Sequence, residues 1–336
     1  MLRLKKSISL VTILLFAIVM LAGCGSSAKK EEVDYPKRPV TIIVPYAAGG
    51  ATDLMARATA AFLEKEFKQP FVTTIKAGAS GAVGLLELAR SKPDGYTLIL
   101  TTTGGCTISP HLNDVGYTNK EFAPIAQVAD IPSIIATHKN APFKTFKEMI
   151  EYVEKNPGKQ LTYGTSGAGS THNIGMEGLI ASINKKGSFK HVPFKGGAEA
   201  VTALLGQHTD LIVAVATEII PQMQSGDFIP LAISSPQRYP LTKDVPTLAE
   251  LGYPKDYAIW STWYGFAAPA GTPKPIIEKL EAGILKATKD PEFKKVFDNM
   301  NQPIEYLGSK EFTDKWMRSY EINKKIIEET GMGKKK

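Results

Sequence analysis

Residues 40–67 read VTIIVPYAAGGATDLMARATAAFLEKEF and contain three patterns in succession. The apolar, β-branched run at 40–44 is typical of a buried strand, and the apolar residues of 53–67 recur at helical spacing. Between them, PYAAGGATD at 45–53 is a glycine-rich turn that Thr52 or Asp53 can cap. The first N–H groups of a helix lack internal partners, and the helix dipole makes that end partly positive. This turn therefore predicts either an anion-binding site or a plain strand-to-helix connection.

The same alternation continues along the chain and predicts an α/β fold with largely parallel sheets. Further β-rich runs lie at 71–75, 97–101, 133–138, 211–215 and 230–234, with helical patterns at 81–91, 145–156, 173–184, 198–206 and 275–289. The last third turns helical, at 292–300 and 309–330. No low-complexity linker separates two halves, which suits two lobes joined by crossing strands. SIIATHKN and IPLAISSP are the segments we expect to cross.

The first residues predict an export signal. MLRLKK is a basic region, SISLVTILLFAIVM is an apolar region, and Leu21-Ala-Gly-Cys24 follows. A secretory signal peptide has this three-part form. The last four residues resemble the lipobox of bacterial lipoproteins, which implies cleavage before Cys24 and lipidation of its thiol. An ordinary signal peptide followed by a chance cysteine is the alternative. Residues 1–23 are thus expected to be the signal and 24–34 a polar tether.

Composition bounds the remaining possibilities. About 310 residues are left after the signal, which favours two domains. The hydrophobic content of 43% is sufficient for sizeable cores. The formal net charge of +7 includes Arg3, Lys5 and Lys6 of the signal, so the mature chain is only mildly basic and no nucleic-acid partner is expected. The two cysteines are Cys24 and Cys106. With Cys24 acylated, Cys106 is a free thiol; no metal spacing is present, and no cofactor is predicted.

Three more glycine-rich turns resemble the first. TYGTSGAGSTHN at 162–173 places four small hydroxyl side chains among three glycines at a second helix start. TTTGGCT at 101–107 follows a predicted strand, and PFKGGAEA at 193–200 precedes a predicted helix. Ligands of open α/β sheets bind at the carboxyl ends of strands. Four such turns predict a cleft lined by neutral N–H and O–H donors, suited to a small molecule that bears an oxyanion.

Long ordered blocks of the chain resemble the solute-binding proteins of tripartite tricarboxylate transporters, also called the Bug family. The resemblance covers nearly the whole mature sequence. It is carried by the blocks YPKRPVTIIVPYAAGGATDLMAR, KAGASGAVGLLELARSKPDGYTLIL, YTNKEFAPIAQVA, YGTSGAGSTHNIGMEGL, VPFKGGAEAVTALLGQHTDL, VPTLAELGYP and WYGFAAPAGTP. It implies a two-lobed fold of the type II periplasmic-binding-protein class, with a ligand cleft between the lobes. It also implies capture of a carboxylated metabolite, delivery to a membrane permease and no catalytic activity.

The same resemblance implies domain limits and site residues. We expect residues 35–135 and 235–336 to form one lobe and residues 136–234 the other, in a monomer held outside the cell membrane by the lipid on Cys24. In the family, the first glycine-rich turn grips a ligand carboxylate through main-chain groups and ordered water. The residues that match the family's contacts are Tyr46, Ala48, Gly49, Asp53, Thr102, Thr103, Gly104, Ser166, Gly167, Gly169, Ser170, His172, Lys195, Gly196 and Ala214. Cys106 departs from the family pattern.

Several of these residues have a structural alternative. His172 could act at a helix cap instead of donating to a ligand, and Lys195 could simply be solvated. Asp53 is expected to be a structural cap first and a ligand contact only for a solute with an ammonium group. Trp263 and Tyr264 are expected to pack in the core or between lobes rather than form a ligand platform.

Two other classes of function remain open from the residues. A serine hydrolase acting on a small ester would use Ser166 or Ser170 with His172. However, GTSGA lacks the second glycine of a G-x-S-x-G elbow, and the sequence offers no third member of a triad. A scaffold or adhesion lipoprotein would not need four donor-rich turns facing one cleft. The identity of the solute is not given by backbone donors, which bind a carboxylate whatever it is attached to.

Overall fold

A computed structural model describes residues 33–333, and a single compact body begins at Tyr35. The predicted signal peptide, Cys24 and nearly all of the predicted tether lie outside the described residues. Within residues 33–333, no helix combines the length and apolar character needed to cross a membrane.

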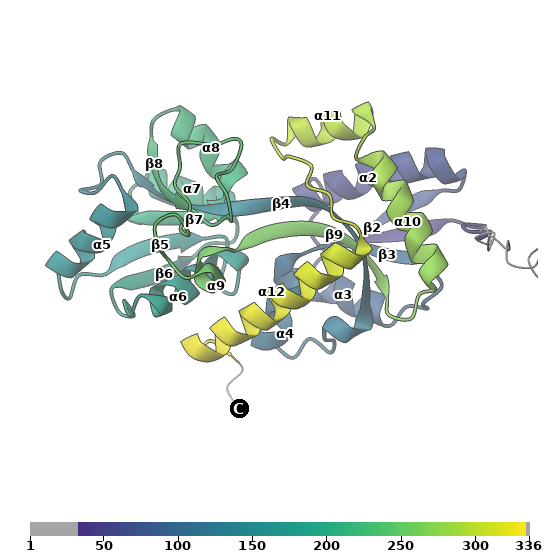
Figure 1. Cartoon of the computed structure of the whole chain (residues 1–336), viewed down its shortest axis with the longest axis horizontal. Coiled ribbons are helices and arrows are strands. Elements are labelled where there is room, and N and C mark those ends of the chain that lie inside the picture. The colour runs from purple at the N-terminus through teal and green to yellow at the C-terminus, as the bar shows by residue number, and fades with distance from the viewer. Residues whose placement is uncertain (1–32, 334–336) are drawn as a thin grey trace, which may run out of the picture. The chain divides into compact units, whose positions relative to one another are not determined.

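The body is built on a nine-stranded mixed sheet in two halves (Figure 1). The strands are β1 (Val40–Val44), β2 (Phe71–Ile75), β3 (Thr97–Thr102), β4 (Phe122–His138), β5 (Leu161–Thr165), β6 (Phe189–Pro193), β7 (Leu211–Val215), β8 (Phe228–Ile233) and β9 (Ser261–Pro269). Their order is β2-β1-β3-β9-β4-β7-β5-β6, with β8 also paired to β4. Strand β1 runs parallel to β2 and β3, and β5 runs parallel to β6 and β7. The pairs formed by β4 and β9 are antiparallel, so the expectation of a largely parallel sheet is wrong.

Helices cover both halves of the sheet. They are α2 (Ala51–Phe67), α3 (Ala82–Ala89), α4 (Ser109–Leu112), α5 (Phe146–Lys155), α6 (Thr171–Ser182), α7 (Gly197–Leu205), α8 (Ala216–Gln224), α9 (Lys255–Ala258), α10 (Lys274–Ala287), α11 (Pro291–Asn299) and α12 (Ser309–Thr330). Side chains of Thr145, Ser170 and Asp290 accept backbone N–H groups at the starts of α5, α6 and α11, as N-caps do. The predicted helices are confirmed within a few residues. Helix α8 was not predicted, because it is short and contains Pro221.

Strand β4 joins the two halves (Figure 1). From Phe122 to Pro132 it pairs with β9, and from Ser133 to His138 it pairs with β7 and β8. The chain therefore passes from the first half to the second at the junction of Pro132 and Ser133, as SIIATHKN predicted. The prediction that the chain crosses back at IPLAISSP is wrong. Strand β8 pairs with β4 alone, and the chain returns through residues 234–260 into β9.

Two separate hydrophobic clusters lie under the two halves. Trp263, Phe312 and Trp316 belong to the first, and their rings pack at centroid distances of 5.0–5.6 Å. The packing role expected of Trp263 is thereby confirmed. The second cluster contains Tyr163 and Leu179 and takes in Leu248, Ala258 and Trp260 from the returning segment. The returning segment therefore packs with the half that contains β5 and β7 as far as Trp260.

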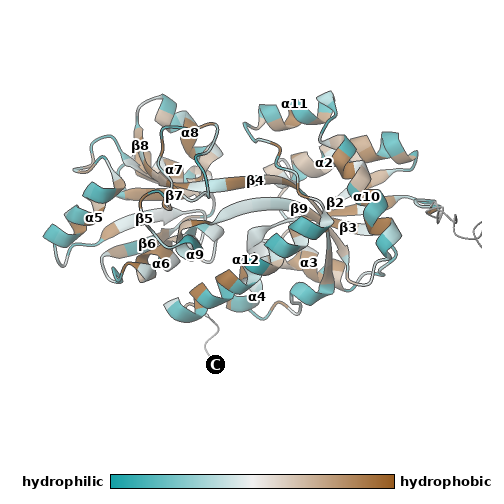
Figure 2. Cartoon of the chain, in the orientation of Figure 1, coloured by the Kyte–Doolittle hydropathy of each residue, from teal (hydrophilic) through white to brown (hydrophobic). Residues whose placement is uncertain are grey.

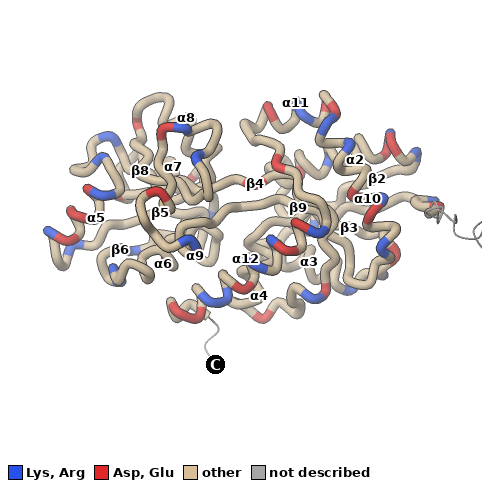
Figure 3. The backbone as a smooth tube through the Cα atoms, viewed as in Figure 1, with Lys and Arg blue, Asp and Glu red and all other residues tan. Residues whose placement is uncertain are grey.

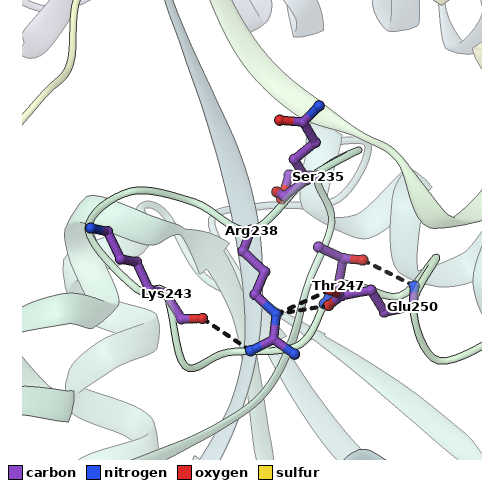
Figure 4. Close-up of polar contacts among 6 residues, drawn as sticks. Ser235, Arg238, Lys243, Thr247 and Glu250 are labelled. Atoms are coloured by element: carbon purple, nitrogen blue, oxygen red, sulfur yellow. Dashed lines mark hydrogen bonds and ion pairs between the residues drawn. The ribbon is translucent and has the colours of Figure 1, made fainter.

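Hydrogen bonds among Arg238, Lys243, Thr247 and Glu250 fix the conformation of the first part of the returning segment (Figure 4). Arg238 Nε lies 3.1 Å from both carboxylate oxygens of Glu250, and Arg238 Nη1 donates to the carbonyl of Lys243. Glu250 also accepts the N–H of Thr247, whose hydroxyl accepts the N–H of Glu250. This reciprocal pair is a capping box, and it fixes the approach of the buried Leu248.

Polarity follows the same layering. Apolar residues gather on the strands and inner helix faces, while the outer helix faces are hydrophilic (Figure 2). Lys and Arg alternate with Asp and Glu over these outer faces, including α12 (Figure 3).

Candidate functional site

The turn between β1 and α2 is closed by the side chain of Asp53. Gly49 has a φ of +78°, which only glycine adopts without strain, and its N–H donates to Asp53 Oδ2 at 2.9 Å. Asp53 Oδ1 also pairs with Arg57 Nε at 2.8 Å. The N-cap is Gly50 and not Thr52 or Asp53, so that expectation is wrong. Asp53 instead reaches back to close the turn, which leaves the first N–H groups of α2 without intrahelical acceptors.

The hydroxyl of Tyr46 links this turn to the end of β3 by a hydrogen bond. Its hydroxyl lies 2.7 Å from Thr102 Oγ1 and 3.4 Å from the carbonyl of Ser80. Burial raises the pKa of Tyr46 well above its ordinary value, so the hydroxyl is neutral at physiological pH. Two of the predicted site residues are therefore in direct contact, and they form a neutral hydroxyl pair.

A π-helical turn, Gly104–Ile108, follows β3 at the second predicted contact. Such turns are frequent at functional sites. The hydroxyl of Thr103 donates to the carbonyl of Ser261 and accepts the N–H of Trp263, both at 3.0 Å, so its side chain is occupied by β9. A Cβ added to Gly104 would have no atom within 4 Å. Gly104 therefore borders open space. The hydrogen bonds of Thr103 to β9 fix the position of Gly104.

Cys106 lies inside the same turn and is fully buried. Its sulfur is 3.2 Å from Thr101 Oγ1. Burial raises the pKa of the thiol, which keeps it protonated. Cys106 is the free thiol that the sequence predicts, in the role of a small core side chain.

The turn between β5 and α6 supplies donors from the other half. Ser170 is the N-cap and accepts the N–H of Asn173 at 3.2 Å, and the N–H of Gly169 donates to Asn173 Oδ1 at 3.0 Å. Gly167 and Gly169 have φ values of +142° and +72°. The hydroxyl of Ser166 forms no hydrogen bond with any described residue. Ser166 is therefore the free hydroxyl of this turn, and Ser170 is committed to the cap.

His172 lies in the first turn of α6 but does not cap it, since Ser170 is the N-cap. His172 is buried, and Nδ1 lies 2.8 Å from the hydroxyl of Ser133 in β4. Burial lowers its pKa to about 4, so the ring is neutral. Among the described residues, no hydrogen bond joins His172 to Ser166 or Ser170. The serine–histidine pair required by the hydrolase alternative is not formed.

The turn between β6 and α7 ends in Gly196, the N-cap of α7. A Cβ on Gly196 would have no atom within 4 Å, and its φ of −172° is ordinary extended backbone. The side chain of Lys195 is exposed, and its backbone N–H donates to Glu199 Oε2 at 3.1 Å. Ala214 is fully buried within β7, opposite Ile134 of β4, so it presents no free surface.

Sequence reasoning missed Glu218 and the site role of Tyr264. Glu218 stands in the first turn of α8, directly after β7. Its carboxyl lies so close to Gly197 that any Cβ there would collide with it. Burial raises its pKa to about 7, and its Oε2 is buried with no hydrogen-bond partner. The pKa of Tyr264 in β9 is raised first by burial and then by the charge of Glu218. Predicting α8 would have shown Glu218 at a fifth strand-to-helix turn.

The candidate site is thus a set of five turns at the carboxyl ends of β1, β3, β5, β6 and β7 (Figure 1). Each is followed by a helical start that presents N–H groups. The side chains that join them are neutral hydroxyls, apart from Glu218. Within residues 33–333 no cluster of three or more His, Cys, Asp or Glu could hold a metal ion. This chemistry suits reversible binding of an anionic group by hydrogen bonds.

Known proteins are similar to this chain in both sequence and architecture. Protein BugT of Bordetella pertussis is 31% identical over 275 residues, which cover 80% of this chain and 82% of BugT. The ligand-free TctC solute-binding protein of Polaromonas has a TM-score of 0.78 and 31% identity, and the match covers 88% of this chain and 99% of that one. These matches confirm the two-lobed α/β fold of periplasmic solute-binding proteins.

Two further solved structures contain dicarboxylates. MatC of Rhodopseudomonas palustris, with bound malate, has a TM-score of 0.70 and 27% identity over 87% of this chain and 100% of its own. An R. palustris protein with adipate has a TM-score of 0.73 and 26% identity over 89% and 99% of the two chains. Residues 55–332 of this chain match the profile described as Tripartite tricarboxylate transporter family receptor. The chain therefore belongs to the tripartite tricarboxylate transporter family of solute-binding receptors, the family that includes the Bug proteins.

Proposed function

We propose that this protein captures a small carboxylated solute outside the cytoplasm and delivers it to the membrane permease of a tripartite tricarboxylate-type transporter. The observation that carries this proposal is the open space beside Gly49, Gly104 and Gly196. A Cβ added to any of these three glycines would have no atom within 4 Å. All three stand at or beside turns whose backbone N–H groups suit a carboxylate.

The protonation states of the site support binding rather than hydrolysis. Tyr46 is neutral because burial raises its pKa, and His172 is neutral because burial lowers its pKa. His172 contacts Ser133 and not the serines at 166 and 170. A serine nucleophile would need a base within hydrogen-bonding distance. Neutral donors can hold an anion and release it unchanged, as a carrier must.

The proposal includes the sequence-based expectations on anchoring and lobes. Lipidation of Cys24 would keep the protein at the outer face of the membrane, near the permease, as a monomer. One acyl chain binds membranes only marginally, so stable tethering requires more than one. We place one lobe at residues 35–132 with the segment from about 261 onward, and the other at 133–260, with the solute between them. Malate and adipate in the two R. palustris structures support a carboxylate as the bound group.

Isothermal titration calorimetry with the purified chain tests this function. The panel contains malate, adipate, succinate, amino acids and aromatic carboxylates, with the corresponding amides as controls that keep the carbon skeleton and lose the anion. At least one carboxylate should bind, and its amide should bind at least about tenfold more weakly, or about 1.4 kcal/mol. Equal affinity for acid and amide would show that the site does not recognise the carboxylate.

Hydrolysis provides the competing outcome. A panel of simple esters should be left intact by the protein, because His172 does not contact a serine at the turn. Ester turnover that disappears in Ser166→Ala would support the hydrolase instead.

A further inference from the structure

Glu218 carries a buried acidic group that the capture of a carboxylate does not use. Its Oε2 is inaccessible to solvent and has no partner, and no hydrogen bond or ion pair to either carboxyl oxygen is found among the described residues. Burying one oxygen of an ionised carboxylate without a partner costs free energy, which a proton or a cation at the carboxyl offsets. Glu218 is therefore a binding group that awaits a counterpart.

The fold makes room for this carboxyl. It lies against the Cα of Gly197, the first residue of α7, where any other amino acid would collide with it. Tyr264 lies on β9 in the other half of the sheet, and its pKa is raised first by burial and then by the charge of Glu218. Tyr264 is buried, and its hydroxyl forms no hydrogen bond with a described residue. The Glu218 carboxyl and the Tyr264 hydroxyl thus both lack a hydrogen-bond partner among the described residues.

The surrounding charges argue against a second carboxylate at this position. No Lys or Arg forms an ion pair with any residue of α7 or α8 in the described part of the chain. Lys195, two residues before α7, has an exposed side chain. Arg57 is already paired with Asp53. A solute with two carboxylates would place an uncompensated charge beside Glu218, whereas a solute with one carboxylate and one cation would leave both groups paired.

We infer that the solute is an amino carboxylate, whose ammonium group pairs with Glu218 while its carboxylate is held by the glycine-rich turns. This inference rests on the proposed function and narrows its substrate class. The ammonium donates to the carboxyl of Glu218, beside Gly197. This contact contributes to specificity, because a cation at that position compensates the carboxylate charge and a second carboxylate does not.

The pairing makes binding depend on pH. Burial raises the pKa of Glu218 to about 7 in the absence of solute, so its carboxylate form becomes dominant only above neutrality. The charged side chains on the elements that pack against α8 are Glu199 on α7, Asp130 and His138 on β4, and Asp227 ahead of β8. None of them contributes to that shift, which is due to burial alone. The affinity for an ammonium should thus rise from about pH 6 to about pH 8 by up to about tenfold.

Calorimetry with matched probes tests the inference. The probes are the amino acids 2-aminobutanoate, 4-aminobutanoate, 2-aminohexanoate and 6-aminohexanoate, the dicarboxylates succinate and adipate, and the monocarboxylates butanoate and hexanoate. At about pH 8 the wild-type chain should bind at least one amino acid about tenfold or more tightly than the other probes of the same length. Glu218→Gln keeps the shape of the side chain and should reduce that preference by about tenfold or more. Asp227→Asn removes an acid that pairs with Lys139 at the surface, and should change the affinity less than about twofold.

The opposite pattern would overturn the inference while leaving carboxylate capture intact. In that pattern a dicarboxylate binds more tightly than every amino acid of its length, weakens from pH 6 to pH 8, and is unaffected or improved by Glu218→Gln. A protonated Glu218 would then be donating to a second carboxylate. Lack of binding by all probes, both to the wild type and to Glu218→Gln, would instead overturn the capture of small carboxylates together with the inference.

Discussion

Glycine at residue 49 has two separate functions, and a matched substitution can separate them. Its φ of +78° shapes the turn, and the open space beside its Cα is where a solute carboxylate is proposed to lie. Gly226, in the turn after α8, has a φ of +77° and the same open surroundings. An alanine at either position therefore introduces the same backbone strain, but only one stands at the proposed site.

Gly49→Ala and Gly226→Ala should both lower the unfolding free energy by about 1 kcal/mol, as expected for a left-handed backbone that gains a Cβ. Only Gly49→Ala should also weaken the tightest carboxylate, by about tenfold or more. Chemical denaturation measures the first effect and titration calorimetry the second. Equal and unchanged affinities in the two variants would mean that the turn after β1 is only a connection.

Glu218 predicts a pH dependence of stability in the absence of solute. Its folded-state pKa is raised from 4.5 to about 7, so the folded state holds its proton more tightly than the unfolded state. The resulting stabilisation is complete below about pH 4.5 and is lost as the pH rises through about 7, for a total of up to about 3 kcal/mol. The unfolding free energy of Glu218→Gln minus that of the wild type should therefore increase over this range.

This difference removes the opposite contribution of His172, whose pKa is lowered to about 4 and whose stabilisation is lost at acidic pH. Urea unfolding at several pH values provides the measurement. A difference that does not change between about pH 4.5 and about pH 8 would show that Glu218 is solvated rather than buried without a partner.

The elements of the fold could be predicted from local patterns, but their pairing could not. β-Branched runs gave β1, β2 and β7 with their observed limits, and amphipathic spacing gave α5 and α12. The antiparallel position of β9 depends on contacts between residues far apart in the chain, such as Gln127 with Gly265. No local pattern encodes such contacts, so the mixed sheet and the true second crossing were missed.

The turns of the candidate site could also be predicted from local patterns, but the hydrogen bonds within them could not. Glycine and hydroxyl residues marked the turns at Gly49, Gly104 and Ser166, because turn chemistry is local. Which donors are free was not predictable, since Asp53 and Ser170 satisfy their own turns while Ser166 remains unbonded. The partnerless state of Glu218 arises from the packing of α8 against α7, which the sequence does not show.

Substitutions of two serines at α6 measure how much its N-cap contributes to the unfolding free energy. Ser170→Ala removes the acceptor of the Asn173 N–H and should lower the unfolding free energy by about 1 kcal/mol. Ser182→Ala, at the other end of α6, removes only a bond to the carbonyl of Leu179 and should cost less than about 0.5 kcal/mol. Denaturation curves of the two variants decide the matter. Similar losses would indicate that the cap contributes no more than an ordinary hydroxyl.

At the scale of the whole molecule, the proposed capture would use groups from both halves. Gly49 and Gly104 belong to the half that contains β1 and β3, and Ser166, Gly196 and Glu218 belong to the half that contains β5, β6 and β7. The described chain passes between these halves at the junction of Pro132 and Ser133 and along the return into β9. A solute that contacts both halves favours the arrangement in which they approach each other, and a solute that contacts one half does not.

Small-angle scattering should therefore show a smaller radius of gyration when the tightest carboxylate saturates the protein, because domain closure around a ligand moves the halves together. Gly196→Ala is the matched control, since its added Cβ enters open space without backbone strain and occupies the position proposed for the solute. At the same solute concentration, this variant should keep the radius of the solute-free protein. If the wild-type radius stays constant at saturation confirmed by calorimetry, the solute is held by one half alone, and the junction at Pro132 and Ser133 does not act as a hinge.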